Sequence, residues 1–206
     1  MNSSKMFIFS LVFLTTYTLR LLEDSHANLQ DLCEDFRYDG MELPIAEVII
    51  GEKTFNFRNC GEMVPIDEVN KDIPVVKFSQ DNETLYLVAM LDPDTPSFRN
   101  PHCRHWVHFI FGNVKGKYLA YGKIRGGNIY GEYNPPNPQP GQGIHRFYFF
   151  VFKQKARLVN RIQITNRCGF NIDGFMEDFD LQPVAMNMFR SEFQNIVLIS
   201  DMMVID

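Results

Sequence analysis

Three long runs of the chain consist, apart from His108, of aliphatic, aromatic and β-branched residues and have no polar face. They span residues 84–91, 106–111 and 147–152. Runs of this length and composition are typical of central strands that are covered on both faces of a sheet. We therefore expect these three segments to form the middle of the main sheet.

Shorter segments of similar character lie between Gly, Pro and Asn residues, at 47–50, 54–57 and 75–78. They predict further strands. Helical spacing occurs late, at 173–179 and 184–197, and the second segment would place Met188, Phe189 and Phe193 toward one side. The pattern predicts a mostly β chain with one or two helices near the C-terminus.

The chain has 206 residues, of which 45% are hydrophobic and 14% aromatic. That is enough for one domain with a sizeable core. The proline-rich segment 134–141 could be an interdomain linker, but both of its flanks are strand-like. We interpret it as a stiff loop that frames a pocket, and we expect a single domain over residues 28–206.

The first residues have the pattern of a secretory signal peptide. Lys5 precedes an apolar run at 6–14, and Ser25 and Ala27 supply the small residues that a signal peptidase reads. The alternative is a membrane anchor, but Arg20 ends a run that is short for a span of ~20 residues. We expect residues 1–27 to be removed, the protein to be secreted, and no transmembrane segment to remain.

The formal net charge of the chain is -5. Nucleic acids and anionic membrane surfaces need a basic face on the protein, so neither is expected as the main partner. If the protein binds an anion, the basic groups that do so must be gathered locally.

Polar groups are concentrated where the apolar runs begin and end. Three short segments, 92–97, 105–108 and 143–147, carry Asp92, Asp94, Trp106, His108, His145 and Arg146. Costly polar groups at the edges of buried strands need one another as partners, and a polar cluster at strand ends is one way in which a sheet builds a ligand pocket. A carboxylate at Asp92 could hold the ring N–H of a histidine and fix its tautomer.

Successive side chains of a strand point to opposite faces of the sheet. Trp106 and His108 should point to one side, and Val107 and Phe109 to the other. An indole beside an imidazole would give the pocket an apolar wall with one polar tip.

The same segments resemble the phosphatidylethanolamine-binding protein family over residues 44–193. The family has an Asp-Pro-Asp-x-Pro segment, then Trp-x-His, then Gly-x-His-Arg before an aromatic strand. Its marks fall here on Asp92, Asp94, Pro96, Trp106, His108, Gly143, His145 and Arg146. The resemblance implies an antiparallel β-sandwich of a large central sheet and a smaller sheet. It also implies a pocket for a phosphate-bearing small molecule or phospholipid headgroup.

This chain departs from the family at three positions. Phe147, Cys103 and Phe189 stand where many members have tyrosines that contribute hydroxyl groups. Each neutral hydrogen bond contributes ~0.5–1.5 kcal/mol, so their loss could weaken phosphate binding by about tenfold or more. We expect Phe147 and Phe189 to line the pocket, with Trp106 and Pro96 as its apolar wall. We also expect the imidazoles to donate to the anion, and Arg146 to support the carboxylate loop.

Four cysteines allow three pairings in an oxidising compartment. We prefer Cys33–Cys60 with Cys103–Cys168, because Cys168 and its neighbours lie near the loop that contains Cys103 in the fold that the chain resembles. A sequon at Asn82 lies in a polar turn, where a glycan would be solvated.

Other interpretations of these motifs must be compared with a binding pocket. Taken alone, the Asp-Pro-Asp segment could be an ordinary turn and Trp106 an ordinary core residue. A zinc site from His102, Cys103, His105 and His108 is disfavoured because the alternation of a strand separates His105 from the other two histidines. A hydrolase built on Asp92, His108 and His145 lacks a nucleophile motif. Protein binding, as an inhibitor of a serine protease or through a receptor, is the main alternative. We expect no enzyme activity and no cofactor.

Overall fold

The computed structural model describes residues 37–38, 41–159 and 162–193. A five-stranded antiparallel sheet forms its centre, with the strand order β10-β9-β6-β7-β8. These strands are β6 (Leu85–Asp92), β7 (Trp106–Lys115), β8 (Asn128–Gly131), β9 (His145–Gln154) and β10 (Leu181–Ser191). The three long apolar runs of the sequence are thus β6, β7 and β9, as predicted.

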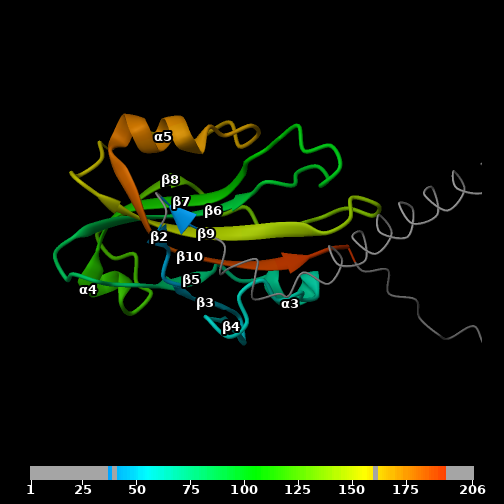
Figure 1. Ribbon diagram of the computed structural model, residues 1–206, viewed down its shortest axis with the longest axis horizontal. Coiled ribbons are helices and arrows are strands. Elements are labelled where there is room, and N and C mark those ends of the chain that lie inside the picture. Colours follow the sequence, from blue (N-terminus) through cyan, green and yellow to red (C-terminus); the bar gives the residue numbers. More distant parts are fainter. Residues whose placement is uncertain (1–36, 39–40, 160–161, 194–206) are drawn as a thin grey trace, which may run out of the picture.

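A smaller antiparallel sheet covers one face of the large sheet, with the order β4-β3-β5. Its strands are β3 (Glu47–Ile50), β4 (Lys53–Phe55) and β5 (Val75–Lys77). The helix α5 (Ile172–Phe179) lies on the other face, as Figure 1 shows. The remaining elements are short: β1 (Arg37–Tyr38), β2 (Met41–Glu42), α3 (Ile66–Val69) and α4 (Gly116–Leu119). The predicted sandwich of a large and a smaller sheet is confirmed.

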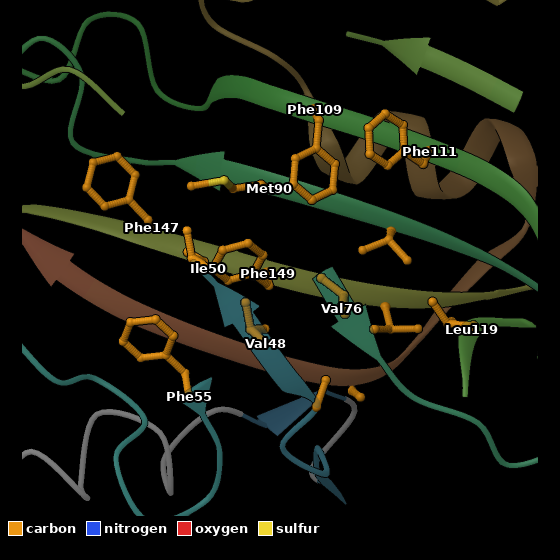
Figure 2. Packing of buried hydrophobic residues seen from close by; sticks show 14 of the residues in the cluster. Val48, Ile50, Phe55, Val76, Met90, Phe109, Phe111, Leu119, Phe147 and Phe149 are labelled. Carbon is orange, nitrogen blue, oxygen red and sulfur yellow. The ribbon is translucent and has the colours of Figure 1, made fainter. Parts of the chain in front are cut away.

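The central strand β6 explains why its sequence has no polar face. Val88 and Met90 pack between the two sheets, in the cluster drawn in Figure 2, whereas Leu87 and Leu91 pack on the side of α5. Successive side chains of a strand point to opposite faces, so a strand that is covered on both faces must be apolar throughout. The same layers fix the positions of the strand ends, where the polar groups gather.

The predicted helix at 184–197 is wrong. Residues up to 191 belong to β10, which pairs with β9 from Leu181 to Ser191, and residues 194–197 lie outside the described part of the chain. Ala185 and Phe189 face the core between the sheets, while Met186 and Met188 face the opposite side. The apolar residues are compatible with either period, and pairing with β9 along nearly the whole strand decides in favour of the strand.

The alternation predicted for β7 is broken by a bulge at His108. Leu91 of β6 pairs with Val107 and Met90 pairs with Phe109, so one step on β6 matches two on β7. Val107 accordingly packs on the α5 side and Phe109 packs between the sheets. An extra residue in one strand resets its alternation. Val107 and Phe109 therefore do not share a face.

The structure tests part of the predicted covalent chemistry. Cys103 and Cys168 form a disulfide with a Cα–Cα distance of 4.4 Å, which confirms that pairing. Cys33, like the predicted signal peptide at 1–27, lies outside the described residues, so the Cys33–Cys60 pairing stays a prediction. Asn82 is exposed, as its sequon requires. None of the helices in the described ranges is long and apolar enough to cross a membrane.

Candidate functional site

A cavity of about 230 Å³ opens at the end of the large sheet where β6 ends and β7 and β9 begin. Asp92, Trp106, His108, His145 and Phe147 line it from the strands. The proline-rich loop covers the other side of the cavity. The loop and the turn after β6 contribute Thr95, Asn134, Pro135, Asn137, Pro138, Gln139 and Gln142. The sequence predicted that this loop frames a pocket but did not identify the residues that line it.

Asp92 is the buried carboxylate of the cavity, with only 2% of its surface exposed. One oxygen accepts a hydrogen bond from the backbone N–H of Asp94 at 2.7 Å. The other accepts from the Thr95 hydroxyl at 2.5 Å and from Nδ1 of His145 at 2.7 Å. Burial by itself would raise the pKa of Asp92, but these hydrogen bonds and the charge of His145 lower it below its usual value. Asp92 is therefore ionised, and both of its carboxylate oxygens accept hydrogen bonds from the protein.

His108 is held by the proline-rich loop. Its Nδ1 lies 2.6 Å from the carbonyl oxygen of Asn134, and the backbone N–H of Asn134 donates to the His108 carbonyl at 2.8 Å. A carbonyl only accepts, so Nδ1 carries the proton. Burial lowers the pKa of His108 from 6.5 to about 4, although Asn134 and Asp92 raise it. The ring is neutral at pH 7, and its Nε2 is then a hydrogen-bond acceptor.

The two imidazoles share one unusual property. Nε2 of His108 and Nε2 of His145 are both buried, and neither has a hydrogen-bond partner among the described residues. Buried polar atoms are normally satisfied, so an unpartnered pair at one cavity needs a partner from outside the protein. The third such atom, the hydroxyl of Tyr133, belongs to a side chain that packs against Phe109 and does not line the cavity.

Phe147 lies between the two imidazoles. Its ring centroid is 5.3 Å from that of His108, in an edge arrangement, and 6.2 Å from that of His145. Phe147 also stacks on Phe189, whose centroid is 4.9 Å away. Phe189 is completely buried and does not line the cavity. Of the two phenylalanines predicted to line the pocket, the structure places only Phe147 there.

Asp94 and Arg146 lie behind the cavity wall and support it. The Asp94 carboxylate is fully buried and accepts from Nε of Arg146 and from a terminal guanidinium nitrogen, both at 2.8 Å. It also accepts from the backbone N–H of Arg146 at 3.0 Å. This bidentate pair joins the turn after β6 to the start of β9, as the sequence predicted, and so holds Asp92 and His145 together.

Two further marks of the motif do not line the cavity. Pro96 was expected in the apolar wall, but it lies outside the lining, directly after Thr95 in the turn that holds Asp92. Gly143 has a φ of 78°, a left-handed conformation that glycine adopts at little cost, and it directs the chain into β9. The sequence pattern therefore grouped residues that contact the cavity with residues that shape its backbone.

The residues considered for zinc do not form a metal site. Cys103 is in a disulfide and cannot supply a thiolate. Within the described ranges, no three His, Cys, Asp or Glu side chains are grouped closely enough to hold a metal ion. The histidines instead divide between different surroundings: His102 is exposed, whereas His108 lines the cavity.

Solved structures share this fold. The carboxypeptidase Y inhibitor, solved with its cognate proteinase, is 20% identical and superposes with a TM-score of 0.63 over 83% of this chain and 93% of that chain. A phosphatidylethanolamine-binding protein from Plasmodium vivax is 23% identical, with a TM-score of 0.59 over 74% and 88% of the two chains. One from Plasmodium falciparum is 18% identical, with a TM-score of 0.54 over 84% and 95%.

The sequence itself matches a family model. The model described as phosphatidylethanolamine-binding protein covers residues 40–197, which include every segment that builds the cavity. The chain therefore belongs to the phosphatidylethanolamine-binding protein family.

Proposed function

We propose that the chain binds a phosphate-bearing small molecule, or the headgroup of a phospholipid, in the cavity between Asp92, His108 and His145. The observation that carries the proposal is the pair of buried Nε2 atoms without a described partner. A phosphate group offers several oxygens to one small space, so a single ligand group can reach both imidazoles. Membership of the family supports the same class of ligand.

The tautomer of His108 refines how such a ligand binds. From the sequence we expected both imidazoles to donate, but the hydrogen bond to Asn134 makes the neutral His108 ring an acceptor at Nε2. A phosphate monoester loses its second proton with a pKa of about 6. A hydrogen bond between the phosphate and Nε2 of His108 therefore needs one proton, which is carried either by the phosphate oxygen or by Nε2. Binding should accordingly take up a proton from solution above pH 6.

The experiment is a calorimetric titration of the protein with phosphoethanolamine at pH 6 and pH 7.5. If one proton is taken up, the affinity should fall by about tenfold or more over this range. His108→Gln should lose most of this pH dependence, whereas His102→Gln, at an exposed histidine outside the cavity, should keep it. An affinity that rises with pH would contradict the proposal. Titrations with inorganic phosphate and with ethanolamine show which part of the ligand is recognised.

We propose binding rather than catalysis. The Asp92–His145 pair resembles the base of a hydrolase, which needs a nucleophile within hydrogen-bond distance of the imidazole. No described residue provides one at either Nε2, and the Thr95 hydroxyl is directed to Asp92. Turnover of an ester substrate that is abolished by His145→Gln would contradict this assignment.

We also propose that the protein is secreted. The Cys103–Cys168 disulfide supports this localisation, because stable disulfides are characteristic of oxidising compartments.

A further inference from the structure

A second cavity, of about 210 Å³, lies on the opposite face of the large sheet from the first. It is lined by Leu91, Pro93, Arg104, His105, Arg146, Tyr148 and Phe150. Along β9, His145 and Phe147 line the first cavity, whereas Arg146 and Tyr148 line the second. Successive residues of a strand point to opposite faces, so β6 and β9 form a wall between the two cavities.

Two guanidinium groups line the second cavity. Arg104 uses its Nε to donate to the Pro93 carbonyl at 3.0 Å, and no described residue accepts from its terminal amino groups. Arg146 is bound to Asp94, the buried carboxylate behind the wall. Asp94 balances the charge of Arg146, and burial lowers the pKa of His105, which also lines the cavity. Asp173 acts on His105 from nearby. The terminal amino groups of Arg104 are therefore the positive groups left to receive the anionic end of a ligand.

The rest of the lining is apolar and partly aromatic. Tyr148 and Phe150 follow each other on one face of β9, with nearly parallel rings whose centroids are 5.9 Å apart. The Arg146 guanidinium lies 5.8 Å from the Tyr148 ring centroid, within the range of a cation–π contact. Leu91 and Pro93 add aliphatic surface. A ligand that fits this lining has an apolar body as well as an anionic end.

We propose that the second cavity binds a small organic monocarboxylate, with its carboxylate on the terminal amino groups of Arg104 and its apolar body against Tyr148 and Phe150. Guanidinium groups match the planar, bidentate geometry of a carboxylate. A phosphate dianion fits less well, because it has no apolar body to pack on the rest of the lining. The site is separate from the phosphate pocket and does not depend on the function proposed for that pocket.

The test is a titration of the whole chain with sodium benzoate, followed by NMR or calorimetry, with inorganic phosphate as the comparison ligand. Arg104→Gln removes the unpaired cation and should weaken benzoate binding by about tenfold or more. Arg99→Gln is the matched control, because it removes the same charge from an exposed position in the same loop, outside the cavity. Its affinity for benzoate should equal that of the unaltered protein. A melting curve for each variant verifies that it is folded.

A variant of the first cavity distinguishes the two sites. His145→Gln should weaken phosphoethanolamine binding and leave benzoate binding unchanged, while Arg104→Gln should do the reverse. The proposal would be overturned by benzoate binding that survives Arg104→Gln or is lost in His145→Gln. The proposal would also be overturned if phosphate bound more tightly than benzoate and lost this affinity in Arg104→Gln. Failure to detect benzoate binding at about 10 mM would overturn it as well.

Discussion

The buried imidazole of His108 should make the protein less stable as the pH falls from 7 to 5. Its pKa is about 4 in the folded protein and about 6.5 in the unfolded chain, because burial penalises the charged ring. Between these values the unfolded state binds the proton more readily, so acid favours unfolding. The stability that the neutral ring contributes is present above pH 6.5 and is lost as the pH falls toward 4.

The magnitude follows from the two pKa values. Their full difference corresponds to about 3 kcal/mol of unfolding free energy, and about 2 kcal/mol of this is lost between pH 7 and pH 5. For a domain of this size, that is a fall in melting temperature of about 4–8 °C. The groups that set this pKa lie on several elements: Asn134 and Asp92 raise it, whereas burial, Arg167 and His145 lower it.

Urea denaturation at pH 7 and pH 5 measures the effect. His108→Gln keeps an amide that can donate to the Asn134 carbonyl but cannot titrate, so its loss of stability should be about 2 kcal/mol smaller than that of the unaltered protein. Other titrating groups contribute equally to both proteins and cancel in the difference. His102→Gln, at an exposed position, should retain the full loss. If His108→Gln and the unaltered protein lose the same stability, His108 does not stay neutral as argued.

Three further predictions concern the support of the pocket by Arg146, the hydroxyl absent at Phe147, and the secretion of the protein. Arg146→Ala leaves the fully buried Asp94 carboxylate without its cation and should lower the free energy of unfolding by about 3 kcal/mol, as measured by chemical denaturation. Arg146→Lys should lower it less. Equal stability of these two variants and the unaltered protein would refute the supporting role. Phe147→Tyr adds a donor between the two imidazoles and should tighten phosphoethanolamine binding by about tenfold, whereas unchanged affinity with a lowered melting temperature would show that the hydroxyl is directed into the core. Protein purified from a secreting host should begin near Asn28 and contain no free thiol, and an intact mass that includes residues 1–27 would argue against secretion.

Much of the site could be predicted because its chemistry is local in the sequence. Asp92 ends one apolar run and His145 begins another, and buried polar groups at strand ends need partners. The sequence predicted that Asp92 holds the ring N–H of a histidine but did not say which one, and the structure shows that it is His145, at 2.7 Å. Asn134 and its loop were harder to assign, because a carbonyl that binds His108 leaves no mark in the side-chain pattern.

The errors have physical causes of the same kind. The helix expected at 184–197 is the strand β10 because its backbone hydrogen bonds are made with β9, a partner that local spacing does not reveal. Phe189 was assigned to the pocket by its place in the C-terminal segment, but it lies in the core beneath Phe147. The bulge at His108 reversed the side on which Phe109 lies. Each error concerns a register or a pairing between distant strands.

The sequence by itself determined the class of fold, the central strands and the groups that must find partners, because hydrophobic alternation and side-chain chemistry are properties of neighbouring residues. The tertiary structure decided which ring nitrogen of His108 carries the proton and which residues of β9 face each cavity. It also decided that Arg104 meets Arg146 on the far side of the sheet. These features depend on contacts between segments far apart in the chain, and only the packing of the two sheets and their loops brings such segments together.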